Sequence, residues 1–427
     1  MSLRHDELEL ALLLSATCAA RESAGARIRY LSHTVNLTTL AVALEHRRLL
    51  PLLGSRLLGA TANNLDERFR NRVVAALARD RAAGMVLEAY TDRLLATLAH
   101  HGIPALELKG PRLAQRVHHD IGLRASADVD LLVAKGDLHG AVSALRREGY
   151  ATPADPITRA GLPHLHFALR HRELPPVELH WRVHWHEEAF SADMLARATQ
   201  DAERALVLDD IDEGAALLLF FARDGFQGLR TLADITGWWD ERGQGLKSGL
   251  LDAHAQRYPE LARTWGAAAR AAEAIGRVPV RSWLTAPRSS DRRTMLALRL
   301  ASWSEQSDRD QLEVNMALVD GLLTPPHSLT QFLQRLLDAP TSRPLLHLAK
   351  VTVRSLAALG CVRRETWDPL PDPRRPENLA TVRLRSGQGR PASFPGSRSL
   401  GPLGPRGRGA RFARRHQKRS QGPQGPE

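Results

Sequence analysis

The chain has 427 residues, of which 43% are hydrophobic and 25% charged, and this ordinary globular composition excludes a chain that is disordered throughout. Its two cysteines, Cys18 and Cys361, exclude a disulfide-built fold and suit a reducing compartment. No apolar run reaches the roughly 18 residues that a membrane helix needs. We therefore expect a cytoplasmic protein that does not cross a membrane.

The positive charge is concentrated near the C-terminus. The formal net charge is +12, but residues 381–427 carry 11 Lys and Arg against a single acid, which leaves +2 for residues 1–380. The same segment holds 9 Gly and 6 Pro and few large apolar residues. Residues 366–427 are therefore predicted to be a disordered basic tail, whose expected partner is a nonspecific polyanion.

Residues 1–100 are predicted to be a helical region. The apolar spacing indicates four helices, near residues 8–14, 37–53, 63–77 and 80–100. Asn63 or Asn64 is expected to cap the third helix, and Gly102 to end the fourth. The apolar run Ala11–Ala20 is similar to the core of a signal peptide, but acids precede it where such a peptide needs positive charge, which favours an amphipathic first helix.

The periodicity changes after residue 100, and residues 101–210 are predicted to form a small α/β unit. Short apolar or alternating runs predict strands over 103–108, 128–133, 164–170 and 176–183, the last two forming a hairpin. Helical spacing predicts helices over 111–118 and 137–149. A second helical region is expected at 211–365, with its clearest helices at 213–225, 228–240, 258–275, 291–304 and 328–337.

Two acids alternate with apolar residues in the run Asp128–Val133. Because side chains on a strand alternate between its faces, Asp128 and Asp130 are expected to point the same way. Two carboxylates on a rigid strand form an oxygen site suited to Mg²⁺, and they repel each other without a cation. The alternative interpretation is an edge strand with a solvated acidic face.

A second alternating run, Val177–Val183, places Glu178, His180 and Arg182 on one face. Glu178 is a candidate third carboxylate beside the aspartate pair, as a site with two metal ions requires. The alternative is a strand with a polar outer side. Lys109 and Gly110 stand at a predicted strand-to-helix turn, where free backbone N–H groups and a lysine charge favour phosphate.

In chain order, these motifs resemble the uncharacterised nucleotidyltransferase family of the DNA polymerase β-like superfamily. The shared pattern is a Gly-containing turn, a DxD strand and a third acid on a later strand, which are here Leu108-Lys109-Gly110, Asp128-Val129-Asp130 and Val177-Glu178-Leu179-His180-Trp181-Arg182. Arg230, Leu232 and Asp234 are similar to the family's helical R-x-L-x-D segment. The superfamily's usual turn is Gly-Ser or Gly-Gly, whereas this chain has Lys-Gly.

The resemblance implies an α+β fold, with a polymerase β-like core of a small mixed sheet and helices, flanked by N- and C-terminal helical regions. It implies transfer of a nucleoside monophosphate from an NTP to a small-molecule or protein acceptor, with two Mg²⁺ ions. By this resemblance, Asp128, Asp130 and Glu178 are expected to act in catalysis and metal binding. Lys109, Gly110, Arg124 and His180 are expected to bind the nucleotide.

Two alternatives remain open. The altered turn motivates a catalytically inactive protein that binds a nucleotide or a partner. Six histidines crowd one region and motivate a zinc-dependent hydrolase, since imidazole is a good zinc ligand, although their spacing matches no known zinc motif. They are His164, His166, His171, His180, His184 and His186.

Overall fold

The computed structural model of the chain describes residues 3–62, 65–151, 165–185, 187–201, 205–226 and 228–285, together with Met316, Val319, Leu322 and Leu323. The chain divides into two units, residues 1–384 and 385–427, and every described residue lies in the first. Several predictions lie outside the described residues, namely the helices at 291–304 and 328–337, the Asn63 or Asn64 cap, His164, His186 and the basic tail.

The N-terminal part is helical, as the sequence predicts. Its helices are α1 (His5–Ser15), α2 (Cys18–Ser23), α3 (Gly25–Thr34), α4 (Leu37–His46), α5 (Leu50–Ala60) and α6 (Glu67–His100). The buried leucines of α1, α3, α4 and α5, together with Phe69, Val73 and Ala76 of α6, form one core with apolar residues of the helices that follow the sheet. The two helical regions therefore bury each other's apolar faces, although the chain enters the sheet between them.

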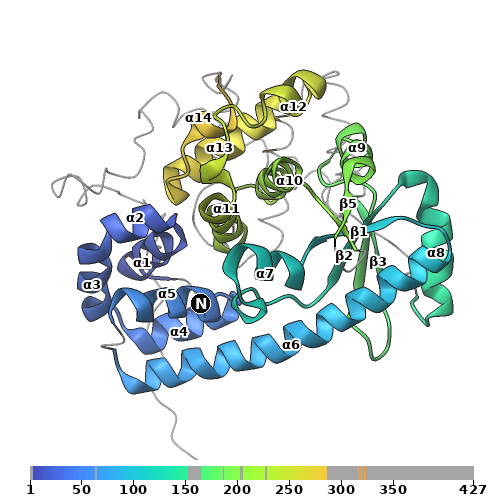
Figure 1. Ribbon diagram of the computed structural model, residues 1–427. Helices are drawn as coiled ribbons and strands as arrows, with labels where there is room; N and C mark the ends of the chain where they lie inside the picture. The colour runs from blue at the N-terminus through green and yellow to red at the C-terminus, as the bar shows by residue number, and fades with distance from the viewer. Residues whose placement is uncertain are drawn as a thin grey trace, which may run out of the picture. The chain divides into compact units, whose positions relative to one another are not determined.

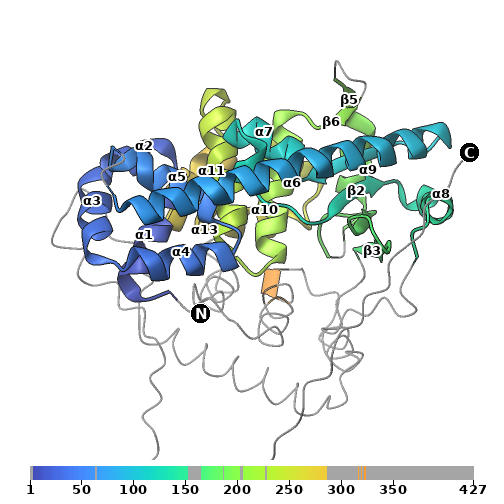
Figure 2. The ribbon, with the colours of Figure 1, turned by 90° about the horizontal axis from the view of Figure 1, so that it is seen from below.

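Helix α6 is one continuous helix, whereas the sequence analysis predicted two helices over this stretch. Gly84 lies in its middle, where a Cβ would approach Ile121 Cγ1 to 2.9 Å. The glycine therefore allows a close contact and does not break the helix. Asp66 caps the first turn, and the positive φ of Gly102 lies just beyond the end. Figures 1 and 2 show α6 extending from the N-terminal helices to the sheet.

The sheet has the order β3-β4-β2-β1-β6-β5. Its strands are β1 (Ala105–Lys109), β2 (Val129–Val133), β3 (His166–Leu169), β4 (Val177–His180), β5 (Thr199–Gln200) and β6 (Leu206–Val207). The β1–β2, β3–β4 and β5–β6 pairs are antiparallel, whereas β2–β4 and β1–β6 are parallel. The predicted α+β fold with a small mixed sheet and the predicted β3–β4 hairpin are thus confirmed. The short pair β5–β6 was not predicted.

The helices predicted over 111–118, 137–149, 213–225, 228–240 and 258–275 are present, most of them with shifted ends, and further short helices were not predicted individually. The helices after α6 are α7 (Pro111–His118), η1 (Ile121–Leu123), η2 (Lys135–Asp137), α8 (Leu138–Arg147), α9 (Ala189–Arg197), α10 (Asp210–Arg223), α11 (Leu229–Glu241), η3 (Gly243–Gly245), α12 (Asp252–Arg257), α13 (Ala262–Gly276) and α14 (Val280–Trp283). Among the described residues, each helix is too short or too polar to span a bilayer.

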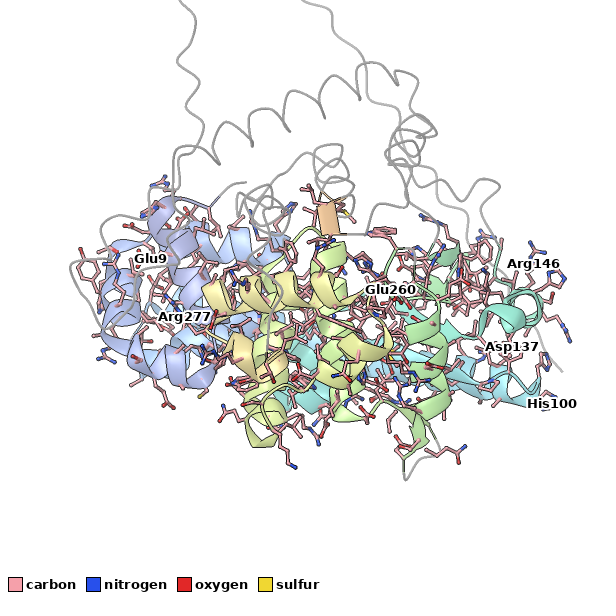
Figure 3. All side chains as sticks on the ribbon, turned by 90° about the horizontal axis from the view of Figure 1, so that it is seen from above. Glu9, His100, Asp137, Arg146, Glu260 and Arg277 are labelled. Carbon is pink, nitrogen blue, oxygen red and sulfur yellow. The ribbon has the colours of Figure 1, made fainter. Side chains whose placement is uncertain are left out.

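The two faces of β2 pack against different layers of the fold. Val129, Leu131 and Val133 pack with apolar residues of α6 and α8, whereas Leu132 belongs to the core shared with the flanking helices. Figure 3 shows the far end of the first layer, where His100 at the end of α6 lies on the same side as Arg146 of α8. This two-sided burial holds the strand rigid and leaves the position of Asp130 facing the helical side.

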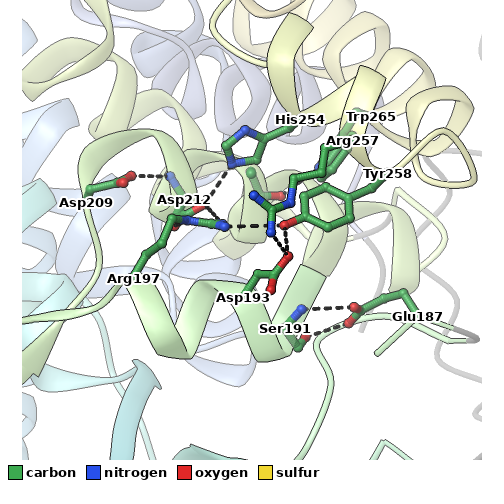
Figure 4. Close-up of polar contacts among 11 residues, drawn as sticks. Glu187, Ser191, Asp193, Arg197, Asp209, Asp212, His254, Arg257, Tyr258 and Trp265 are labelled. Carbon is green, nitrogen blue, oxygen red and sulfur yellow. Dashed lines mark hydrogen bonds and ion pairs between the residues drawn. The ribbon is translucent and has the colours of Figure 1, made fainter. Parts of the chain in front are cut away.

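A polar network attaches the helix that follows β4 to the C-terminal helices (Figure 4). Arg197 of α9 donates to both carboxylate oxygens of Asp212 on α10, at 2.9 and 2.7 Å. His254 of α12 lies 2.7 Å from Asp212 Oδ1, and the Tyr258 hydroxyl donates to Asp193 at 2.6 Å. These contacts connect α9, α10 and α12. A local sequence pattern could not predict them, because the residues lie far apart in the chain.

Candidate active site

Three adjacent strands bring charged residues together on the helical side of the sheet. Asp130 on β2 is in register with Glu178 on β4 and with Lys109 on β1. Directly paired residues of neighbouring strands project to the same face. Asp128 precedes the first residue of β2, so it lies just outside the strand that was predicted to contain it.

Asp130 is the most buried acid of this group, with 2% of its surface exposed. Its Oδ1 atom lies 3.3 Å from Lys109 Nζ and 3.1 Å from His180 Nε2. Burial alone would raise the pKa of Asp130, but the charges of Lys109 and His180 more than offset this and hold the pKa well below its usual range. Asp130 is therefore ionised in the folded protein.

Glu178 lies between two imidazoles. Its Oε1 is 3.7 Å from His166 Nε2, and its Oε2 is 3.4 Å from His180 Nε2. Burial opposes ionisation of Glu178, but the hydrogen bond from His180 and the charge of His166 lower its pKa. Burial, assisted by the charge of His180, lowers the pKa of His166 to about 4, so that imidazole is neutral near pH 7.

Asp128 shows the opposite shift. Burial raises its pKa, and the neighbouring negative charge of Asp130 raises it further, against the positive charge of Lys109. At Asp128, burial and the charge of Asp130 thus outweigh the positive charge of Lys109. A raised carboxylate pKa of this origin is what a divalent cation would reverse.

The predicted turn between a strand and a helix is confirmed at Gly110. Gly110 has φ +147, and α7 begins at Pro111 directly after it. A Cβ on Gly110 would overlap Glu107 Oε1. Glycine is therefore required here both for its backbone conformation and because a buried carboxyl group of β1 packs against it.

The structure brings Arg124 together with Asp234, which the sequence analysis did not foresee. Arg124 Nε donates to both oxygens of Asp234, at 3.0 and 2.9 Å, and Nη1 donates to Ser126 at 2.9 Å. His118 Nε2 also lies 3.3 Å from Asp234. Arg230 of the same helix donates to the backbone carbonyl of Ala125 at 3.2 Å. The R-x-L-x-D segment thus packs against the loop that leads to Asp128.

Arg223 of this cluster was not selected from the sequence, and His166 was named only among the six histidines of the zinc alternative. His166 on β3 is in register with His180, and its ring centroid lies 4.7 Å from that of His180. Arg223, at the end of α10, is buried, and its positive charge contributes to the low pKa of Asp130. Alternation on β3 could have indicated His166, but no local motif identifies Arg223.

A cavity of about 420 Å³ lies beside the approach to Asp128. The loop Ala125–Ala127 lines one side of it, and residues of α4, α5 and α6 line much of the rest, together with Arg48. A neighbouring cavity of about 450 Å³ shares Ala83, Ser126 and Ala127 and is mainly apolar. Both cavities thus border the loop that precedes Asp128, and the residues that line them do not include Asp128, Asp130 or Glu178.

The donor set fits a divalent cation. Asp130 and Glu178 supply carboxylate oxygens from neighbouring strands, and hard divalent ions prefer such ligands. His166, Glu178 and His180 offer ligand atoms that all lie within 4.8 Å of one another. The arrangement suits the binding of a cation together with an anionic substrate.

Residues 33–276 match a family model described as an uncharacterised nucleotidyltransferase. The match covers more than half of the chain and includes all six strands of the described sheet, and the acidic cluster with them. A search of the curated proteins found no match, and neither did a search of the solved structures.

Proposed function

The chain belongs to the uncharacterised nucleotidyltransferase family, and on that premise we propose that it transfers a nucleoside monophosphate from an NTP to a small-molecule or protein acceptor with the help of Mg²⁺. The observation that carries the proposal is the register of Asp130 with both Glu178 and Lys109. It unites two carboxylates and a lysine on one face, next to the turn at Gly110.

Asp128, Asp130 and Glu178 would hold two Mg²⁺ ions. When bound, such ions neutralise the triphosphate and lower the pKa of an acceptor hydroxyl. Lys109, at present paired with Asp130 at 3.3 Å, would contribute positive charge to the phosphates, which it can do as a compact point charge. The backbone at Gly110 would approach the triphosphate.

The reaction is a displacement at the α-phosphorus. The acceptor oxygen forms a bond to phosphorus, the bond to the pyrophosphate oxygen breaks, and the hydroxyl proton passes to Glu178 or through it to solvent. His180, which is within 3.1 Å of Asp130 and 3.4 Å of Glu178, orients both carboxylates. Positioning and charge stabilisation account for most of the catalysis of such transfers.

A catalytically inactive nucleotide-binding protein is the second candidate. The observation that favours it is the turn itself, where the Glu107 carboxyl group packs against Gly110 and where a serine for phosphate binding is replaced by the Lys109-Gly110 pair. Release of pyrophosphate distinguishes the two candidates, because an inactive protein binds an NTP without releasing it.

The first test is calorimetric titration of each NTP, with and without Mg²⁺, into the wild type and an Asp128→Asn/Asp130→Asn variant. The amides keep the side-chain shape and remove the charge. We expect Mg²⁺-dependent binding that the variant loses while its circular dichroism is unchanged. Asp137→Asn, an acid of η2 outside the cluster, is the matched control and should bind as the wild type does. Absence of binding to every NTP would contradict the proposal.

A further inference from the structure

Two imidazoles converge on one carboxylate at the β3–β4 side of the proposed site. His166 and His180 are opposite each other in register on antiparallel strands, and the two oxygens of Glu178 lie 3.7 and 3.4 Å from their Nε2 atoms. Asp130 Oδ1 lies 3.1 Å from His180 Nε2. Two nitrogen donors and the Glu178 carboxylate thus meet around a small volume, and Asp130 lies beside it.

Hydrogen bonding accounts for only part of this arrangement, since His180 Nε2 lies within hydrogen-bond distance of Asp130 Oδ1, at 3.1 Å. The 3.7 Å separation of His166 Nε2 and Glu178 Oε1 is longer than a hydrogen bond. The Nδ1 atoms of His166 and His180 are buried, and no described residue gives either of them a hydrogen-bond partner. His180 is fully buried. Leaving buried polar atoms unpaired is costly, so the hydrogen bond to Asp130 explains the placement of His180 only in part and does not explain that of His166.

The spacing matches coordination of a metal ion. A tetrahedral ion with bonds of about 2.0–2.1 Å has its ligand atoms about 3.4 Å apart. The distance from His180 Nε2 to Glu178 Oε2 is 3.4 Å, and the distance from His166 Nε2 to the other carboxylate oxygen, Oε1, is 3.7 Å. Each oxygen of Glu178 thus lies near this spacing from one of the imidazoles. Two imidazoles and a glutamate are also a ligand set that transition metals occupy in catalytic sites.

We propose that His166, Glu178 and His180 bind a first-row transition-metal ion, of which Mn²⁺ and Zn²⁺ are the representatives. Mg²⁺ prefers oxygen ligands and keeps its waters, whereas imidazole favours transition metals. One of the two cation positions of the proposed function would therefore select such an ion over Mg²⁺. The inference rests on the proposed function for its place in catalysis, but the binding of the ion does not require a nucleotide.

The test uses metal salts alone, without nucleotide, and the full-length protein. Calorimetry would measure the affinities for Mn²⁺, Zn²⁺ and Mg²⁺. Pulsed electron paramagnetic resonance on the Mn²⁺ complex would detect coupling to ¹⁴N of a bound imidazole. His166→Ala is the principal variant, because His166 is only partly buried. His180→Asn, which retains a polar side chain of similar reach, addresses the buried ligand. His139→Ala, an exposed histidine of α8 on the far layer, is the matched control.

We expect the wild type and His139→Ala to bind Mn²⁺ or Zn²⁺ at least about tenfold more tightly than Mg²⁺, and His166→Ala to lose about tenfold or more of that affinity, a typical effect of a disturbed metal site. The ¹⁴N coupling should weaken in His166→Ala and in His180→Asn. Equal affinities for Mg²⁺ and Mn²⁺, or unchanged binding and ¹⁴N coupling in His166→Ala, would overturn the proposal.

The two proposals can fail separately. If the transition-metal site is wrong but nucleotidyl transfer is right, NTP binding with Mg²⁺ persists while Mn²⁺ shows no ¹⁴N coupling. If nucleotidyl transfer is wrong, no pyrophosphate is released from any NTP, whereas the metal titrations still report the His166–Glu178–His180 site.

Discussion

Glu107 has the least compensated environment of the described carboxyl groups near the site. It lies on β1 in register with Leu131, on the face opposite Asp130. Both of its carboxyl oxygens are buried without a hydrogen-bond partner, and Arg112 Nε approaches one of them only to 3.7 Å. Burial raises the pKa of Glu107 to about 7, against the nearby charges of Arg112 and Arg116. The packing that positions the Gly110 turn therefore has an electrostatic cost.

This cost predicts a pH-dependent stability. Because the pKa rises from 4.5 to about 7 on folding, the unfolded chain releases the Glu107 proton first. The wild type should therefore lose stability relative to Glu107→Gln as pH rises from 4.5 to 7, by about 3 kcal/mol at most. Urea unfolding of both proteins across this range measures the difference. Parallel pH profiles would show that Glu107 ionises normally.

At the scale of elements, the Arg124–Asp234 pair joins the segment before β2 to α11. Both residues are buried, and the pair also includes His118 of α7. Burial opposes the charge of Asp234, but Arg124 and His118 lower the pKa of Asp234. The buried charges of Arg124 and Asp234 thus compensate each other. This connection holds the loop that leads to Asp128, so the family-like R-x-L-x-D segment supports the site from outside it.

Removal of Asp234 should therefore be strongly destabilising. Asp234→Ala leaves the buried Arg124 charge unpaired, which typically costs about 3–5 kcal/mol. The control is Glu148→Ala, which removes the ion pair with Arg93, a side chain that is 60% exposed. Such surface pairs contribute about 1 kcal/mol or less. Denaturant unfolding of both variants provides the comparison, and equal losses of stability would contradict the structural role of the buried pair.

At the scale of the whole molecule, the tail carries most of the net positive charge and the folding unit carries little. Residues 381–427 carry 11 Lys and Arg and one acid, whereas residues 1–384 form the unit that contains every described residue. The excess charge that makes the chain basic is therefore located outside the described fold. Electrostatic affinity for polyanions should follow the tail and not the proposed active site.

Truncation after Leu384 tests this separation. The truncated chain should lose its salt-sensitive binding to single-stranded oligonucleotides, because the counterion release that drives such binding falls with the number of neutralised phosphates. Its thermal unfolding should remain that of the full chain. Fluorescence anisotropy at increasing salt measures the binding. A full-length variant with Arg411, Arg414 and Arg415 changed to Gln is the matched control and should show an intermediate salt dependence. Undiminished binding by the truncated chain would place the basic surface in the folded unit.

Features that depend on residues close together in the sequence could be predicted from it. The alternation in Asp128–Val133 and Val177–Val183 identified two strands with one apolar face each. The Lys109-Gly110-Pro111 turn was recognised because glycine and proline restrict the backbone locally. Gly102 was expected to end a long helix for the same reason. These patterns, together with the family resemblance, were sufficient for the α+β class and the order of most elements.

The tertiary structure decided which of these residues meet. The register of Asp130 with Glu178 joins residues 48 positions apart, and the Arg124–Asp234 pair spans 110 positions. His166 entered the cluster only through the pairing of β3 with β4. The two helices predicted over 63–77 and 80–100 are one helix, α6, in which Gly84 allows the close approach of Ile121. Backbone and side-chain preferences act over a few residues, whereas packing and charge compensation act between whatever residues the fold brings together. The strand faces and the candidate acids could therefore be predicted from the sequence, whereas the Arg124–Asp234 pair and the place of Arg223 could not.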